Sequence, residues 1–439
     1  MAAVPVSARS RDEQLRVAVE RVHEEVERRE DELIATIGDL VRLPSPLGLE
    51  APAQTYVAEH LRASGARVDV WESDESLKQL PGAGDPGVLF AGRPNVAGVF
   101  AGAGGGRSLI LQGHIDVVSA EPVEDWSYDP WQATIVGDRM YGRGAYDMKC
   151  GIAGNMLLPR ILCDLGIELR GDLIVQSVIE EECSGNGALD ASRRYQADAA
   201  LVAESMNGDF VFAHVGVMWF KIEIAGKTSH AARALEGVNA ISKAVPVIQA
   251  LEALDRRLNE ERHPAFAAIP HPVGVNIGMI AGGDWPSTLA GRCELRCRMG
   301  VYPGHTIEEM RGEIDTALRL AAADDDWLSE RPPVVTYYGH QSPGSIVALD
   351  EPFVQTLGEW HARVTGRPLR YRADTGTLDM RYYNFAGMPS GCYGAAGANP
   401  HAADEWLDLR SLVPTVQVLA GFVLDWCGIA GIPDAARGG

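Results

Sequence analysis

The chain has 439 residues, of which 46% are hydrophobic and 23% charged, a balance typical of a globular protein with a large core and not of a disordered chain. At about 150 residues per domain, this length predicts two or three domains. The 60 acidic residues outnumber the 39 basic residues and give a net charge of −21. This charge argues against a general nucleic-acid-binding protein and against docking on an anionic membrane surface.

No segment has the sequence of a membrane span or of a secretory signal. The most apolar stretch, near residues 416–432, contains Gln417 and Asp425, which indicates an amphipathic helix. No apolar core follows the first basic residues. The seven cysteines are odd in number and scattered, so they do not form a disulfide framework. We therefore expect a cytoplasmic protein.

The N-terminal part is predicted to combine helices with short strands. Residues 11–42 carry Leu and Ile at helical spacing among Glu and Arg, which predicts an exposed amphipathic helix. A second helix is expected over 51–64. Two apolar runs, at 96–101 and 108–112, flank a glycine-rich loop that lacks the Lys-Ser/Thr ending of a phosphate-binding loop. We expect these two runs to form a hairpin.

Helices and strands then alternate along the chain. A helix is predicted to end near Leu165, followed by a strand at 172–179, a helix at 188–195 and a strand at 199–203. This alternation is typical of a largely parallel sheet that helices cover on both faces.

A distinct unit is predicted between residues 215 and 340. Its order of strand, helix, two strands, helix and strand is the ferredoxin-like arrangement, with these elements at 219–224, 240–258, 273–280, 292–299, 306–322 and 333–338. The alternation then resumes and ends in an amphipathic helix at 414–426. The simplest architecture is an α/β domain made of residues 1–214 and 341–439, with a largely parallel central sheet, interrupted by a smaller α+β domain at 215–340.

Polar side chains with metal-binding chemistry recur where these apolar strands end. His114 and Asp116 follow the apolar run 109–111. Residues two apart in an extended segment face the same side, so the two side chains can meet, as they do in many metal sites. Taken alone, this pair is better explained as an ordinary polar strand end.

Four further positions share this pattern. Taken separately, each has a structural explanation, such as a helix cap, a solvated run of charge or a surface residue. Taken together they predict a site, because strand ends in an open α/β sheet converge on one crevice. Mixed His and Asp/Glu donors suit zinc, and also cobalt or manganese. The positions are Asp147, the run of Glu180, Glu181 and Glu182, Glu204, and His401.

The order of the motifs GHIDVV, YGRGAYDMK, IEEE…GNG, AES, GKTSHAA and PHAADE resembles the dinuclear zinc amidohydrolases of the peptidase M20 type. That family includes acetylornithine deacetylase, succinyl-diaminopimelate desuccinylase, aminoacylase and carboxypeptidase G-like enzymes. The resemblance covers nearly the whole chain beyond the N-terminal helix. It implies a catalytic α/β domain and an inserted lid domain at 215–340 through which two subunits form a homodimer.

The resemblance also implies two Zn²⁺ ions per subunit, with Co²⁺ or Mn²⁺ as alternatives. Asp147 would bridge the two ions. His114 and Glu204 would complete the shell of the first ion, and Glu182 and His401 that of the second.

Three catalytic roles follow from the same resemblance. Glu181 matches the general base, which would take a proton from a metal-activated water and deliver it to the leaving amine. Asp116 would clamp the imidazole of His114. His230, in the inserted domain, would reach the active site, often that of the partner subunit, and stabilise the oxyanion.

Two arginines are candidates for binding the substrate. Arg381 matches a family Arg near the substrate carboxylate, which a guanidinium can hold bidentately. Arg298 matches a form found among the deacylases, although many relatives place their Arg one position later. Another departure is Glu180, where Asp is common in the family.

The expected activity is metal-dependent removal of an N-acyl group from a small amino-acid-like amine. A metallo-dipeptidase or carboxypeptidase, and an N-formyl or N-carbamoyl amine hydrolase, remain open as alternatives. A binding protein that lost catalysis is disfavoured, because every expected metal ligand, Glu181 and His230 are present. A thiol hydrolase using Cys183 or Cys150 is also disfavoured, since no His shows a thiol-protease signature near either cysteine.

Overall fold

A computed structural model describes residues 10–433, and within them nine strands form a mixed sheet. These strands are β1 (Arg67–Trp71), β2 (Asn95–Phe100), β3 (Leu109–His114), β7 (Leu173–Val178), β8 (Ala199–Val202), β9 (Phe210–His214), β14 (Ser345–Ile346), β15 (Tyr371–Asp374) and β16 (Ser390–Tyr393). Their order is β1-β2-β7-β3-β8-β16-β9-β14, and β15 also pairs with β9. The central neighbours β7, β3, β8 and β16 run parallel, whereas the pairs toward the two edges include antiparallel ones.

Helices enclose the centre of this sheet. Strands β3, β7 and β8 are buried along their whole length, as strands covered on both faces must be. The first set of helices contacts β1, β2, β3 or β7 and comprises α3 (Ala51–Ala63), α4 (Cys150–Asp164) and α11 (Leu412–Cys427). A second set contacts β7, β8 or β16 and comprises α5 (Asn186–Arg194) and α10 (Met380–Phe385). Three helices pack outside α4 and α11, namely α1 (Arg11–Arg28), α2 (Glu30–Val41) and α9 (Pro352–Thr365).

The hairpin expected from the runs at 96–101 and 108–112 is wrong. Strand β7 lies between β2 and β3, antiparallel to the first and parallel to the second. The reason is that β7 is buried on both of its faces, so it takes a central place in the sheet, between the two strands that a hairpin would have paired. The sheet is accordingly mixed, with its parallel strands at the centre.

Two helix predictions also need correction. The single helix expected over 11–42 is divided at Arg29, whose φ of −104° and ψ of 19° interrupt the helical path between α1 and α2. The helix expected at 414–426 is present as α11, but it is not amphipathic, because its residues are buried nearly all round against α1, α4, α9 and the sheet.

A second antiparallel sheet is built from four of the described strands. They are β10 (Gly216–Ala225), β11 (Val275–Gly282), β12 (Arg292–Val301) and β13 (Val334–Ser342), in the order β11-β12-β10-β13. With α6 (Ala240–Glu260) and α7 (Ile307–Ala323) they follow the expected order of strand, helix, two strands, helix and strand, and α8 (Asp326–Glu330) follows α7.

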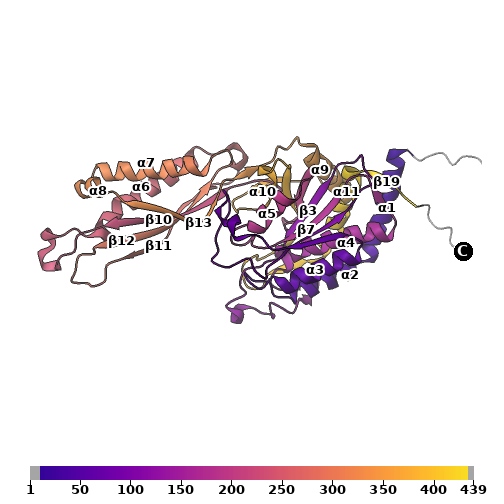
Figure 1. The fold of residues 1–439 in the computed structure, drawn as a ribbon, viewed down its shortest axis with the longest axis horizontal. Coiled ribbons are helices and arrows are strands. Elements are labelled where there is room, and N and C mark those ends of the chain that lie inside the picture. The colour runs from indigo at the N-terminus through magenta and orange to yellow at the C-terminus, as the bar shows by residue number, and fades with distance from the viewer. Residues whose placement is uncertain (1–9, 434–439) are drawn as a thin grey trace, which may run out of the picture.

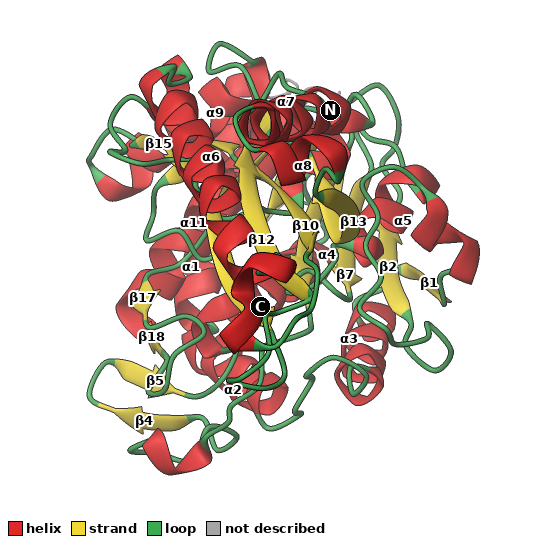
Figure 2. Cartoon of the chain, turned by 90° about the vertical axis from the view of Figure 1, so that its left-hand side faces the viewer, coloured by secondary structure: helices red, strands yellow, loops and turns green. Residues whose placement is uncertain are grey.

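Figures 1 and 2 show α6 and α7 on one face of this four-stranded sheet, which extends away from the nine-stranded sheet along the longest axis of the molecule. Its buried side chains form a hydrophobic cluster separate from that of the larger sheet. The fold is thus mixed α/β, with a smaller α+β unit.

The remaining strands form two small sheets. One has the order β17-β18-β5-β4, from Gly397–Ala398, Trp406–Asp408, Arg139–Tyr141 and Thr134–Val136, and the other pairs β6 (Glu168–Leu169) with β19 (Ile429–Gly431). Among residues 10–433, no helix combines the length and the apolar character that a membrane span requires.

Candidate metal centre

The carboxyl ends of three central parallel strands carry the predicted ligands. His114 is the last residue of β3, the acidic run begins two residues after β7, and Glu204 comes two residues after β8. Because these strand ends meet at one edge of the sheet, their side chains converge. Glu181, Glu182 and Glu204 border a cavity of about 590 Å³, and His114 lies buried behind it. The opposite wall of the cavity includes Trp219, Arg298 and His340 from the four-stranded sheet.

The five predicted metal ligands come together as two groups that share Asp147. His114, Asp147 and Glu204 form one group and Asp147, Glu182 and His401 the other, with the donor atoms of each group within 4.8 Å of one another. One oxygen of Asp147 lies 3.2 Å from Nε2 of His114, and the other lies 3.2 Å from Nε2 of His401. Nε2 of His401 is 2.8 Å from Glu182. Asp147 is therefore placed between the two groups.

The donor set fits divalent metal ions. Imidazole nitrogen and carboxylate oxygen are the donors that zinc and its neighbours accept, and clustered buried carboxylates are stable only beside positive charge. Burial, reinforced by the charge of Asp147, raises the pKa of Glu204 to about 8. Hydrogen bonds to Asp147 and Glu182 raise the pKa of His401 to about 10. The raised pKa of His401 reflects the carboxylates that surround its ring.

Glu405 fixes the loop that carries Asp147. One of its carboxylate oxygens accepts hydrogen bonds from the backbone N–H groups of Tyr146 and Asp147, each at 3.0 Å. The other accepts from the backbone of Gly144 at 3.0 Å and from the guanidinium of Arg143 at 2.5 Å. Glu405 is not among the residues predicted for the site, although it closes the PHAADE motif.

Asp116 orients the site in a way that differs from the expected clamp. Nδ1 of His114 lies 2.9 Å from the backbone carbonyl of Asp116 but 3.7 Å from its carboxylate. The carboxylate instead accepts the backbone N–H groups of Glu181 and Glu182, at 3.2 and 3.1 Å. The carbonyl is nearer to the ring, so the main chain of Asp116 holds His114 and the side chain holds the acidic run.

The acidic run is divided by a backbone turn at Glu180, whose φ is +70°. The Glu180 carboxylate points away from the cavity and binds the guanidinium of Arg93 at 2.5 Å and the hydroxyl of Ser184 at 2.6 Å. Glu181 and Glu182 line the cavity. Burial raises the pKa of Glu181 well above its ordinary value, so its carboxylate is a stronger base than an exposed one.

Two other predicted residues lie outside this cavity. His230 is exposed on the four-stranded unit, lines a different cavity, and accepts the backbone N–H of Ala232 at its Nδ1. Arg381 is fully buried, and its Nη2 donates to the carbonyl of Ser184 and to the hydroxyl of Tyr382. Neither side chain reaches the predicted metal ligands of its own chain.

Arg298 does line the cavity, as the sequence analysis proposed for a substrate-binding residue. Within the described residues it forms no ion pair. Trp219 and His340, on the same wall, were missed. Little in the sequence marks them as cavity residues, because each is an isolated residue in a strand and belongs to no motif.

Two relatives with named activities resemble the chain over most of its length. An N-formyl-4-amino-5-aminomethyl-2-methylpyrimidine deformylase of Halalkalibacterium halodurans is 29% identical over 435 residues, which is 93% of this chain and 97% of that protein. An acetylornithine deacetylase of Vibrio cholerae is 29% identical over 339 residues, which is 76% of this chain and 85% of that protein.

Solved structures share the fold. A tripeptidase of Staphylococcus aureus superposes with a TM-score of 0.72 at 22% identity, covering 91% of this chain and 98% of that one. A Bacillus subtilis protein described as a dinuclear metal binding peptidase of the M20 family gives a TM-score of 0.65 at 15% identity, covering 91% and 99%. The sequence itself matches Peptidase family M20/M25/M40 over residues 110–425, which include every predicted metal ligand. The chain belongs to Peptidase family M20/M25/M40.

Proposed function

We propose that the chain is a metal-dependent amide hydrolase that removes a small acyl group, formyl or acetyl, from a primary amine. The observation that carries this proposal is that Glu181 lines the same cavity as residues of both donor groups, namely Asp147, Glu182, Glu204 and His401. The matched relatives include deformylases and deacetylases, whose named substrates are amides of small acids. The deformylases match 92–93% of the chain, which favours formyl as the acyl group.

Two Zn²⁺ ions are the cofactors we assign, with Co²⁺ or Mn²⁺ as substitutes that suit the same donors. His114 and Glu204 would hold one ion, Glu182 and His401 the other, and Asp147 both. When bound, such a pair of ions acidifies water and polarises an amide carbonyl.

Glu181 is the group to which we assign proton transfer. Its carboxylate takes a proton from water as the water oxygen bonds to the carbonyl carbon, and it returns that proton to the nitrogen as the C–N bond breaks. The products are a carboxylic acid and an amine. A pKa raised by burial suits both steps, because the group must accept a proton and then give it up.

A second candidate is hydrolysis of an N-acyl amino acid or a dipeptide, and Arg298 is the observation that favours it. Its guanidinium faces the cavity and has no acidic partner among the described residues, so it is available to a substrate carboxylate. Arg381 is a weaker candidate for this contact, because its side chain is enclosed.

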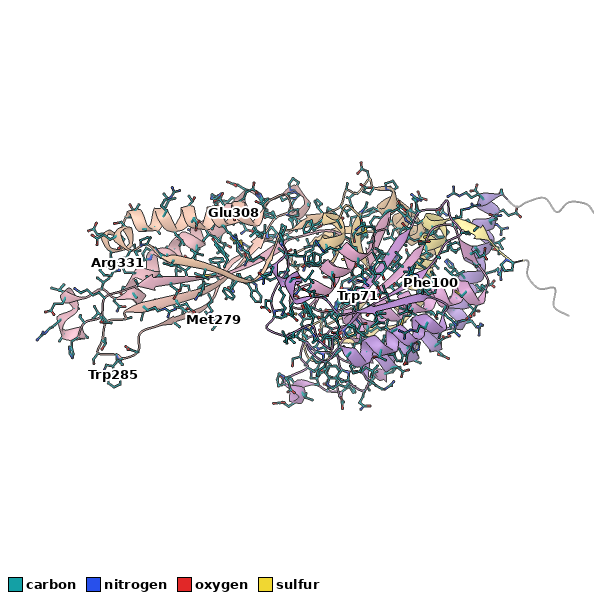
Figure 3. The ribbon with its side chains drawn as sticks, viewed as in Figure 1. Trp71, Phe100, Met279, Trp285, Glu308 and Arg331 are labelled. Carbon is teal, nitrogen blue, oxygen red and sulfur yellow. The ribbon has the colours of Figure 1, made fainter. Side chains whose placement is uncertain are left out.

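We also propose that residues 215–340 form a lid through which two copies of the chain pair, while 1–214 and 341–439 form the catalytic domain. Strand β11 is an edge strand, and Met279 within it and Trp285 just after it are 61% and 67% exposed. Figure 3 shows both on the part of the lid that projects away from the nine-stranded sheet. An open edge with exposed apolar side chains favours pairing with a second copy.

His230 supports the same pairing. Its Nδ1 accepts a backbone N–H, so Nε2 carries the ring proton and is a donor suited to an oxyanion. Because the ring lies far from the metal ligands of its own chain, the proposed lid pairing would let it serve the partner subunit's site. The cysteines of the described residues are all free, which agrees with a reducing cytoplasmic setting.

The test is release of amine from N-formyl, N-acetyl and N-carbamoyl amines, N-acyl amino acids and dipeptides. Each would be assayed with chelator-stripped protein and with protein restored with Zn²⁺ or Co²⁺. We expect turnover only after restoration, and its loss in Glu181→Gln but not in Glu359→Gln, a matched change of an exposed glutamate. Turnover that survives metal removal, or full activity in Glu181→Gln, would contradict the proposal.

A further inference from the structure

A bulge in strand β13 places a histidine in the wall of the cavity of about 590 Å³ described above. Trp219 pairs with Tyr338 while the preceding residue, Met218, pairs with Gln341, so two residues of β13 have no partner on β10. They are Gly339 and His340. Bulges of this kind redirect a side chain beside a functional site.

Only glycine fits the first position of this bulge. Gly339 has a φ of +60°, and a Cβ atom there would lie 2.7 Å from Cε3 of Trp219. The indole ring therefore packs directly over the backbone of the bulge. The same geometry places His340, which is only 8% exposed, in the wall of the cavity that holds the metal ligands.

The tautomer of His340 follows from its neighbour. Nη2 of Arg381 lies 3.4 Å from Nε2 of His340, and a guanidinium only donates hydrogen bonds. Nε2 must therefore be the acceptor, which leaves the ring proton on Nδ1. Burial, followed by the charges of Arg381 and Arg298, lowers the pKa of His340 to about 3, so the ring stays neutral at physiological pH.

Nδ1–H of His340 has no acceptor among the described residues, although its ring is almost enclosed. Beside it, Trp219 lies on the opposite face of β10 from Met218 and Phe220, which pack into the hydrophobic cluster, and Trp219 is 39% exposed. One wall of the cavity therefore offers an accessible indole and a neutral hydrogen-bond donor.

The charges on this wall select against a cationic ligand. Arg298 and Arg372 both line the cavity. Arg372 is paired with Asp374, which also accepts the backbone N–H of Gly376, so these two charges offset each other. Arg298 has no acidic partner among the described residues, so an ammonium group beside its strand neighbour Trp219 would face an unpaired guanidinium.

We propose that Trp219 and His340 form the subsite for the amine portion of the substrate, and that this portion is an uncharged, planar heteroaromatic ring. The ring stacks on the indole of Trp219, and a ring nitrogen accepts the Nδ1–H of His340. Arg381 acts as a positioning residue that holds His340 in the required tautomer. This inference rests on the proposed amide hydrolysis and names its substrate class.

The test compares two formamides of similar size, N-formyl-aminomethylpyrimidine and N-formyl-cyclohexylmethylamine, on the metal-restored full chain. We expect the wild type to prefer the planar substrate in kcat/KM by about tenfold or more, the effect of one stacking partner. Trp219→Leu should abolish this preference and Trp219→Phe should retain most of it. Tyr338→Phe, a conservative change outside the cavity lining, should leave it unchanged.

His340 is tested separately. His340→Leu should lower kcat/KM for the pyrimidine substrate about tenfold and leave the cyclohexyl substrate unaffected, since only the first accepts the hydrogen bond. His340→Asn, which places an amide donor near the same position, should recover part of the loss. If His340→Leu lowered kcat/KM equally for both substrates, the proposed hydrogen bond from His340 to the ring would be refuted.

Binding of the uncharged formamide without turnover separates this inference from the proposed function. Calorimetric titration of metal-stripped protein with N-formyl-aminomethylpyrimidine should show binding that Trp219→Leu weakens, even if no formamide were hydrolysed. Equal hydrolysis of both formamides would overturn ring recognition while leaving amide hydrolysis in place. Absence of Trp219-dependent binding would overturn the subsite itself.

Discussion

A carboxylate oxygen of Glu405 accepts the backbone N–H of Asp147 at 3.0 Å, across 258 residues of sequence. Glu405, which is not a predicted metal ligand itself, thus holds the main chain of Asp147, the residue that we assign to both metals. The second oxygen of Glu405 holds Gly144 and Arg143, so four donors converge on one carboxylate. The position of Asp147 therefore depends on the hydrogen bonds that Glu405 accepts.

Glu405→Gln should weaken metal binding while leaving the fold intact. An amide has one oxygen in place of two and adds an N–H₂ group facing donors, so part of the network is lost. We expect metal affinity to fall about 10- to 100-fold, as for other changes beneath a metal ligand. Competition with a fluorescent zinc chelator would measure this, with Glu359→Gln as the control. Unchanged affinity would show that Asp147 is held by other contacts.

Arg93→Met should strongly destabilise the protein. Arg93 bridges Glu50 and Glu180, and all three side chains are almost fully buried. Removing the cation leaves two carboxylates unpaired, which costs about 3–5 kcal/mol in comparable buried networks. Denaturant unfolding would measure the loss against Arg42→Met, whose exposed ion pair should contribute less than about 1 kcal/mol. Similar losses in the two variants would contradict a structural role for the Arg93 network.

Metal loading should release protons at neutral pH. The hydrogen bonds to Asp147 and Glu182 raise the pKa of His401 to about 10, and the charge of Glu204 raises that of His114 despite its burial. In metal-free protein at pH 7 both rings are therefore protonated, and each must lose its proton to bind a metal. Metal affinity should consequently fall as the pH falls.

Calorimetry in buffers of different ionisation enthalpy would count the protons released. We expect a clear release with zinc at pH 7 and a smaller one in His401→Ala. No dependence on the buffer would mean that the rings are already neutral.

Mixing two inactive variants should restore activity if His230 serves the partner subunit. Glu181→Gln and His230→Ala each spoil every site of their own homodimers. A mixed dimer contains one site with both residues intact, so an equimolar mixture after subunit exchange should regain about a quarter of wild-type activity. Size-exclusion chromatography would confirm the dimer. A mixture that stays inactive although mixed dimers form would place His230 outside the partner's site.

The two donor groups could be predicted because each of their residues follows an apolar strand or lies in a recognisable motif. His114, Glu182 and Glu204 lie at neighbouring strand ends, where topology alone brings them together. The expected hairpin was wrong for the opposite reason. Nothing local in the runs at 96–101 and 108–112 reveals that β7, more than sixty residues later, separates them.

The cavity wall that contains Trp219 and His340 could not be predicted from the local sequence pattern. His340 enters the cavity because the pairing of β10 with β13 shifts by two residues, and that shift depends on where each strand is anchored. The one local clue is Gly339, which interrupts a strand rich in Val, Thr and Tyr. Arg381 was predicted from its motif to contact the substrate, whereas the structure encloses its side chain and places it beside His340.

The two walls of the cavity come from two different sheets, and each sheet packs against its own hydrophobic cluster. The nine-stranded sheet supports the donor groups, and the four-stranded sheet supports Trp219 and Arg298. Substitutions on the four-stranded sheet can therefore change which amine is accepted without disturbing the stability of the nine-stranded sheet or its affinity for metal. Related proteins can in this way evolve different substrate preferences while the donor groups and Glu181 stay the same.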